Sequence, residues 1–283
     1  MQSLLKYPRT PHIQGSRIQV GDEDLSQIPF RVLAGRRITV EEKCDGANTA
    51  VSFDADGTLL LQSRGHYLTG GPRERHYNLM KKWATVHRDR FHAVLGGRYI
   101  MYGEWLYAKH SIYYDALPHY FMEFDVYDRE RRVFLDTEAR RALLKPLPVV
   151  SAPVLAQRTF KSLEELKALL GPSAYIRPGH IDRLHAYCEA NAKCGSADLR
   201  CAETDPSTMM EGLYIKVEED GRVVDRMKFV RQSFLQCVTV SNTHWLDRPI
   251  VPNGLRYSVD ILYEPVLPKE AWSWCAKQAW LNS

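Results

Sequence analysis

The strongest constraint on the fold is a series of short β-prone segments separated by turn sequences. Seven such segments occur at residues 38–42, 50–53, 59–62, 98–103, 120–127, 212–217 and 223–230. Helical patterns fall between them, at residues 73–90, 137–144 and 162–170. This mixture predicts an α+β fold, in which antiparallel sheets carry helices packed on the outside.

Length and composition fit an intracellular globular protein. At 283 residues, with 45% hydrophobic and 25% charged residues, the chain can bury a core as one large domain or as a domain with an appendage. Its net charge of +4 is too small to indicate nucleic-acid binding by itself. No apolar run is long enough to cross a bilayer, the first residues lack a signal-peptide pattern, and the six cysteines have no framework spacing. We therefore expect a cytoplasmic monomer without membrane contacts.

The segment at residues 151–208 is predicted to be a helical insertion. Ser162 and Glu165 form a capping-box pattern, and Pro178 precedes a second helical stretch. A zinc site is the alternative here, but the spacing lacks a paired C-x-x-C arrangement, so we favour a surface helical module that touches the substrate. The zinc candidates are His185, Cys188, Cys194 and Cys201. Residues 1–235 would then form the main domain, and residues 236–283 a short C-terminal extension.

Lys43 stands beside a carboxylate at a turn, in the sequence Lys43-Cys44-Asp45-Gly46. Asp-Gly between β-prone runs is also an ordinary hairpin signal, and the two interpretations are compatible. A nucleophilic lysine must lose its proton, although its usual pKa is about 10.4. Neighbouring cations, a metal ion or burial lower that pKa, whereas carboxylates raise it. Carboxylates near Lys43 would therefore serve mainly to hold a divalent cation.

Chemically compatible motifs follow Lys43 in a definite order. They are Ser63-Arg64-Gly65, Tyr102-Gly103-Glu104-Trp105, Phe121-Met122-Glu123-Phe124-Asp125, Glu211-Gly212-Leu213-Tyr214-Ile215-Lys216 and Arg226-Met227-Lys228-Phe229. Each alone is a plain strand or core pattern, but their joint order is specific. With Lys43, they resemble the covalent nucleotidyltransferase superfamily of RNA ligases, DNA ligases and mRNA capping enzymes. The chain is most similar to the RNA ligase 2-like branch.

The resemblance implies an ATP-grasp-like nucleotidyltransferase domain with a nucleotide cleft between sheets. It implies ATP and Mg²⁺ or Mn²⁺ as cofactors, with Glu42 at the adenine amino group and Phe124 stacked on the base. The implied catalytic residues are Lys43, Asp45, Glu211, Lys216, Arg226 and Lys228. The implied nucleotide contacts are Glu42, Lys43, Asn48, Ser63, Arg64, Glu104, Phe124, Lys216 and Lys228. The implied metal ligands are Glu211, Asp45 and, directly or through water, Glu104.

One motif departs from the family pattern. Two lysines spaced by one residue are common there, whereas this chain has Arg226 and Lys228. Both side chains are cations on one strand face, but arginine offers a fork in place of a point charge. Lys228 is therefore the better candidate for a catalytic contact.

Two further groups of cations are candidates for RNA or phosphate contacts. Arg9, His12 and Arg17 lie in an extended N-terminal stretch that either holds a phosphate or is simply packed. Arg73 and Arg75 begin a basic segment that continues to residue 90. Such a segment attracts a phosphate backbone, or it is a solvated helix face.

The expected function is therefore joining of RNA 3'-hydroxyl and 5'-phosphate ends, through lysyl-AMP and an adenylylated 5' end, in RNA repair. An end-healing kinase or phosphatase would be a partner. A DNA ligase or a capping-type guanylyltransferase is the enzymatic alternative, although about fifty residues after Lys228 are few for the barrel that both usually append. The non-enzymatic alternative is an RNA-end-binding module.

Overall fold

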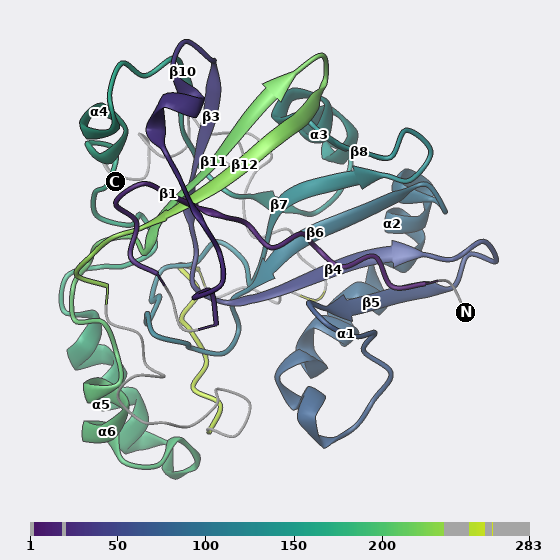
Figure 1. Ribbon diagram of the computed structural model, residues 1–283. Helices are drawn as coiled ribbons and strands as arrows, with labels where there is room; N and C mark the ends of the chain where they lie inside the picture. The colour runs from purple at the N-terminus through teal and green to yellow at the C-terminus, as the bar shows by residue number, and fades with distance from the viewer. Residues whose placement is uncertain (1–2, 19–20, 235–248, 258–261, 263–283) are drawn as a thin grey trace.

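The computed structural model describes residues 3–18, 21–234, 249–257 and 262, and its centre is a large, mostly antiparallel β-sheet (Figure 1). The strands follow one another in the order β10-β3-β11-β12-β8-β7-β6-β4-β5, while β1, β2 and β9 join at β12 and β7. The strands are β1 His12–Ile13, β2 Gln27–Ile28, β3 Ile38–Lys43, β4 Ala47–Phe53, β5 Leu59–Ser63, β6 Tyr99–Trp105, β7 Phe121–Asp128, β8 Val133–Leu135, β9 Val150–Ser151, β10 Val154–Arg158, β11 Gly212–Glu219 and β12 Arg222–Val230. The α+β prediction is confirmed.

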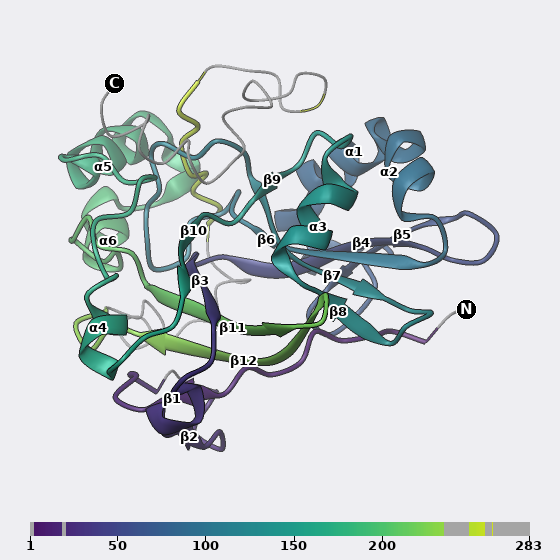
Figure 2. The same cartoon turned by 90° about the horizontal axis from the view of Figure 1, so that it is seen from above.

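The sheet has two halves, one formed by β10, β3, β11 and β12 and the other by β8, β7, β6, β4 and β5. Separate helices pack against each half. The helices are η1 Phe30–Leu33, η2 Pro72–Tyr77, α1 Asn78–Val86, α2 Arg88–Leu95, α3 Thr137–Leu144, α4 Leu163–Lys167, α5 His180–Ala190, η3 Ala192–Cys194 and α6 Ala197–Ala202, where η marks a 3-10 helix. Trp83 of α1 and Phe91 of α2 join Phe121 of β7 in one core. Leu166 of α4 joins Ile215 of β11 in a second core. Figure 2 shows α1 and α2 beside β4 and β5, with α4 at the other end near β3.

The Asp45-Gly46 turn joins these two halves. In the described part of the chain, β3 pairs with β10 and β11, whereas β4 pairs with β5 and β6. The hairpin interpretation of this turn is therefore wrong, because the strands on its two sides are not partners. A Cβ at Gly46 would lie 2.6 Å from Leu106 Cδ2 and 2.8 Å from the Trp105 carbonyl oxygen. Glycine is needed here because the crossing chain passes close to β6.

The basic segment at residues 73–90 forms η2, α1 and the start of α2 rather than one helix. Met80, Trp83 and Ala84 are the buried residues, while the Val86 side chain is exposed. Val86 is the last residue of α1, whose C-cap is His87.

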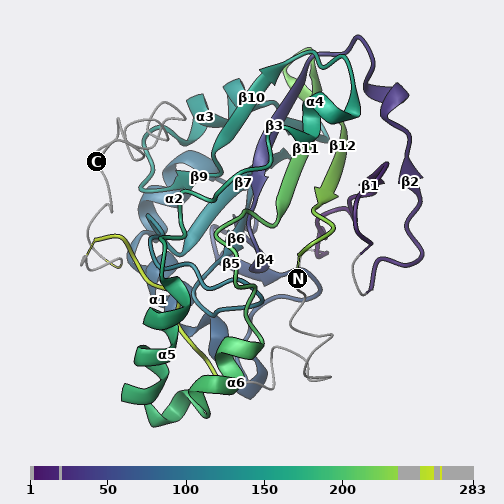
Figure 3. The same ribbon diagram turned by 90° about the vertical axis from the view of Figure 1, so that its left-hand side faces the viewer.

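The segment at residues 151–208 is only partly helical. Strand β10 pairs with β3 at the edge of the sheet, so residues 154–158 are part of that sheet. Helices α4, α5 and α6 follow, and Figure 3 shows α5 and α6 together at one end of the molecule, away from β1 and β2. Most of the expected extension at 236–283 lies outside the described residues. Within it, buried Asn253 accepts a hydrogen bond from the Tyr114 N–H and donates one to the Leu106 carbonyl.

Candidate active site

A cavity of about 880 Å³ lies where the two halves of the sheet meet. The N-terminal segment, the β3–β4 turn, the loop after β5, and strands β6, β7, β11 and β12 all contribute to its wall. Its charged lining consists of seven carboxylates and three lysine or arginine residues. The carboxylates are Asp22, Glu41, Glu42, Asp45, Glu74, Glu104 and Glu211, and the cations are Lys43, Arg64 and Lys228. This excess of negative charge disfavours an anionic ligand unless a cation accompanies it.

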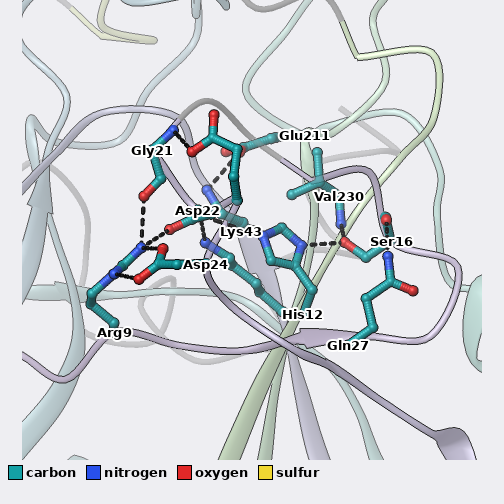
Figure 4. Close-up of polar contacts among 12 residues, drawn as sticks. Arg9, His12, Ser16, Gly21, Asp22, Asp24, Gln27, Lys43, Glu211 and Val230 are labelled. Atoms are coloured by element: carbon teal, nitrogen blue, oxygen red, sulfur yellow. Dashed lines mark hydrogen bonds and ion pairs between the residues drawn. The ribbon is translucent and has the colours of Figure 1, made fainter.

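Lys43 ends β3 and points to Glu211 (Figure 4). The pairing of Lys43 with Gly212 brings Glu211 beside it, and Lys43 Nζ lies 2.6 Å from Glu211 Oε1. The Lys43 side chain keeps 21% exposure, whereas the Glu211 side chain is fully buried. Burial alone would lower the pKa of Lys43, but Glu211, Glu104 and Asp45 outweigh it and raise that pKa. Without a ligand, Lys43 is therefore an ammonium group.

The other two carboxylates of the expected metal set have different surroundings. Glu104 lies on β6 opposite Asn48, and burial, together with Glu211 and Asp45, raises its pKa to about 8 against the opposing effect of Lys43. Asp45 Oδ2 instead accepts hydrogen bonds from the N–H groups of Ser111 and Ile112, at 2.7 and 2.9 Å. Asp45 thus anchors the loop after β6 as well as facing the cavity.

The expected catalytic cations other than Lys43 do not share one location. Lys228 lines the cavity and forms an ion pair with Asp22. Lys216 is buried instead, with its Nζ 2.8 Å from Glu41 Oε2 and 3.0 Å from Asp125 Oδ1. Arg226 lies over the Phe134 ring at 3.9 Å and is not part of the cavity wall.

The N-terminal cations are bound within the protein itself. Arg9 contacts Asp22 and Asp24, and His12 Nδ1 lies 2.7 Å from Ser16 Oγ. Arg17 donates to the carbonyl groups of Gln232 and Phe234. None of Arg9, His12 and Arg17 lines the cavity in the described structure. What the sequence did not reveal is that this segment supplies Tyr7, Thr10, Gly21 and Asp22 to the wall.

One part of the cavity wall is aromatic. Phe124 lies on β7, and its ring centroid is 5.1 Å from that of Tyr7 and 6.2 Å from that of Tyr214. The Tyr7 hydroxyl donates to Asp125 and is hydrogen-bonded to the Tyr214 hydroxyl. Tyr7 and Tyr214 are cavity residues that the motif analysis missed, because their partners are more than a hundred residues away in sequence.

The polar nucleotide-contact candidates lie around this wall. Buried Glu42 accepts a hydrogen bond from Ser173 Oγ at 2.5 Å, so the segment before α5 fixes its carboxylate. Ser63 Oγ is 3.0 Å from His66 Nδ1, and Asn48, Ser63 and the exposed Arg64 line the cavity. The Ser173 contact is a second feature that sequence spacing could not show.

The basic segment contributes Glu74 and Tyr77 to the cavity wall. Arg73 and Arg75 belong to η2, and Arg75 is not a lining residue. Lys81 forms an ion pair with Glu74, which also accepts hydrogen bonds from the N–H groups of Thr69 and Gly70. Glu74 therefore holds the loop that carries Arg64.

No three His, Cys, Asp or Glu side chains among the described residues are placed to hold a metal ion together. The sulfur-rich cluster near α5 is packed rather than arranged for zinc: Cys188 and Cys194 are buried beside Leu184, and His185 contacts Asp198. The three carboxylates around Lys43 do not form a complete metal site either. The helices in the described ranges include none long and apolar enough to cross a membrane.

Comparison with known proteins places this chain in a family. Two variants of the Naegleria gruberi RNA ligase, each with ATP and Mn, are similar in fold, with TM-scores of 0.50 and 0.51 and identities of 16% and 17%. Each match covers 83% of this chain and 58% of the Naegleria chain, so this chain spans little more than half of that protein. An archaeal ATP-dependent RNA ligase matches with a TM-score of 0.46 and 14% identity, over 81% of this chain and 48% of its own.

No curated protein sequence matches the chain. The family model described as RNA ligase matches residues 36–230. That range runs from the strand that carries Lys43 to the end of β12, and it includes Glu104, Glu211 and Lys228. The matched range is well over half of the chain, and the chain belongs to the RNA ligase family.

Proposed function

We propose that this chain is an ATP-dependent RNA ligase that joins a 3'-hydroxyl to a 5'-phosphate through a lysyl-AMP intermediate on Lys43. The observation that carries the proposal is the Lys43–Glu211 pair, which lies in an 880 Å³ cavity inside the range matched by the RNA ligase family. A binding module would not need a partly exposed amine held at the wall of such a cavity.

In the first step, Lys43 Nζ attacks the α-phosphorus of ATP. The N–P bond forms, the bond to pyrophosphate breaks, and the lysine releases a proton. Because neighbouring carboxylates raise the pKa of Lys43, the step needs positive charge that the unliganded site lacks. Lys228 and Arg64 supply part of that charge at the cavity wall. Positioning and charge neutralisation, rather than acid–base chemistry, are the protein's contribution.

A divalent metal ion would supply the remaining charge and polarise the phosphate. Mg²⁺ is usually held by one or two carboxylates plus substrate phosphates rather than by a complete protein cage. Glu104, Glu211 and Asp45 fit that description: burial and the two neighbouring carboxylates disfavour a negative charge on Glu104 and raise its pKa to about 8, which a bound cation would offset, and no full ligand set is present in the described residues. The presence of ATP and Mn in the Naegleria structures supports this assignment.

The adenine ring would occupy the aromatic part of the wall. Phe124 offers a face for stacking, and Tyr7 and Tyr214 border it. Glu42, held by Ser173, would accept a hydrogen bond from the adenine amino group. Guanine presents a carbonyl oxygen at that position, which a carboxylate repels. The wall therefore favours ATP over GTP.

Two transfers complete the reaction. The 5'-phosphate of RNA displaces Lys43 from AMP, and the 3'-hydroxyl then attacks the activated 5' end, forming the phosphodiester and releasing AMP. Ends of this kind arise when a kinase and a phosphatase heal broken RNA, which supports a role in RNA repair.

The test is incubation with α-labelled ATP or GTP and Mg²⁺ or Mn²⁺, followed by denaturing gels. We expect label from ATP in the wild type and in Lys82→Ala, a control that removes an exposed lysine of α1, but not in Lys43→Ala. Label from GTP alone would favour a capping-type enzyme. Sealing of all-DNA nicks as well as RNA-containing ones would favour a DNA ligase. Absence of label, in protein shown not to be already adenylylated, would favour the alternative that the chain is an RNA-end-binding module.

A further inference from the structure

The Asp22 carboxylate forms an ion pair with Lys228 at the cavity wall. The N-terminal segment reaches the end of β12, where His12 pairs with Lys228 in a parallel arrangement. Asp22 Oδ2 accepts a hydrogen bond from Lys228 Nζ, and both residues line the cavity. The side chains are only 8% and 10% exposed, so the pair is largely removed from solvent. Figure 4 shows Asp22 near Lys43 and Glu211.

Several contacts hold Asp22 in this position. Arg9 donates to Asp22 Oδ1 at 3.3 Å, to the Gly21 carbonyl at 2.6 Å, and to both oxygens of Asp24. His12 Nε2 lies 3.4 Å from Asp22 Oδ2. The carboxylate is therefore fixed by three separate side chains rather than resting by chance on the lysine.

The Asp22–Lys228 ion pair occupies a cation that could otherwise bind a phosphate group of the nucleotide. Of the three lysine and arginine residues in the cavity wall, Lys43 is paired with Glu211 and Lys228 with Asp22. Only Arg64 forms no ion pair within the described residues. An oxygen of a carboxylate and an oxygen of a phosphate make the same charge-assisted bond to an ammonium group, so they compete for it. The charge of Asp22 also repels an arriving phosphate.

We propose that Asp22 sets the affinity of this site for nucleotide by occupying Lys228 until a phosphate group displaces it; the inference rests on the proposed function. Binding then includes the cost of breaking the Asp22–Lys228 pair. Asp22 thereby lowers the affinity of the site for the triphosphate and speeds the release of pyrophosphate and AMP.

The test compares Asp22→Asn with Asp24→Asn. Asp24 also binds Arg9, but its side chain is 68% exposed and has no contact with Lys228, so it is a matched control. Binding of the α,β-methylene analogue of ATP, which cannot adenylylate Lys43, is measured by calorimetry with Mg²⁺. Inorganic pyrophosphate, which needs no base pocket, is titrated in parallel.

We expect Asp22→Asn to bind both ligands about tenfold more tightly than the wild type, and Asp24→Asn to bind them as the wild type does. The gain should vanish in a Lys228→Met background, because the competition is for that lysine. Asp22→Ser should reproduce the gain and serves if Asp22→Asn does not fold. A structural role would give looser binding, not tighter.

Unchanged or weaker pyrophosphate binding in the Asp22 variants would overturn the inference. Tighter pyrophosphate binding without binding of the ATP analogue by any variant would uphold the competition at Lys228 and instead remove the proposed ligase function. The two failures are therefore distinguishable.

Discussion

The protonation state of Lys43 is set by the residues that surround it. Burial favours the free amine, while Glu211, Glu104 and Asp45 together favour the ammonium form. We expect Lys43→Ala to lose covalent labelling by ATP by at least a thousandfold, because no other group replaces the attacking nitrogen. The same variant should still seal RNA that carries a pre-adenylylated 5' end, within about tenfold of the wild type, since that step does not use the amine. Gel assays of the two steps measure this, and parallel loss of both would contradict a purely nucleophilic role.

The Glu42 carboxylate accepts a hydrogen bond from the Ser173 hydroxyl group. Ser173→Ala removes the hydrogen bond to Glu42 Oε1, and a bond of this kind to a charged group contributes about 1.5 to 3 kcal/mol. We expect the preference for ATP over GTP in Lys43 labelling to fall at least tenfold. The control is Ser151→Ala, which removes a similar bond to Glu123, a residue outside the cavity wall. An unchanged nucleotide preference in Ser173→Ala would show that Glu42 does not read the base.

At the scale of elements, Gly212 of β11 lies against the backbone of β12. A Cβ at this position would lie 1.8 Å from the Phe229 carbonyl oxygen, which is impossible without separating the strands. We expect Gly212→Ala to lower the free energy of unfolding by about 3 kcal/mol or more, toward the upper end for overpacked sites, and to displace neighbouring Glu211. Gly171→Ala, where a Cβ would meet nothing within 4 Å, is the control. Denaturant unfolding measures both, and equal stability would mean that the strands separate easily here.

Strands were predictable because each carries its own local signal, whereas their partners were not. Alternation and turn residues located β3, β4 and β11 to within a few residues. The Asp45-Gly46 turn is not a hairpin, although its sequence favours one, because pairing depends on distant strands: Lys43 of β3 pairs with Gly212, more than 160 residues away. Strand β10 was missed for the same reason, since its place at the sheet edge depends on β3.

The site was predictable where a motif signals its own chemistry. Lys43, Glu211 and Glu104 were found from their motifs, and the structure brings them to one cavity. Lys216 is expected among the nucleotide contacts because its motif implies it, yet in the described structure it forms ion pairs with Glu41 and Asp125. Long-range contacts of this kind leave no pattern in the local sequence.

At the scale of the whole molecule, a buried charge network joins the two halves of the sheet. Arg140 of α3 is fully buried, and its guanidinium group lies 2.5 Å from Glu41 Oε1 and 3.3 Å from Glu123 Oε1. Glu41 lies on β3 and Glu123 on β7, so one side chain connects strands from the two halves of the sheet. Lys216 adds a second cation to Glu41. The cavity therefore keeps its shape through charges as well as through apolar packing.

Removal of Arg140 should loosen this connection. We expect Arg140→Met to reduce the free energy of unfolding at pH 8 by about 3 to 5 kcal/mol, because it leaves buried carboxylates with too little positive charge.

Burial raises the pKa of Glu123 although Arg140 opposes it, and loss of Arg140 would raise that pKa further. A carboxyl group with a raised pKa binds its proton more tightly in the folded state, so lowering the pH stabilises the folded variant. The deficit should therefore shrink between pH 8 and pH 5, and adding Glu123→Gln should restore part of the stability. The exposed Arg131, changed to Met, should alter stability by less than about 0.5 kcal/mol. A deficit in Arg140→Met below about 1 kcal/mol, or one independent of pH, would mean that apolar packing alone holds the two halves together.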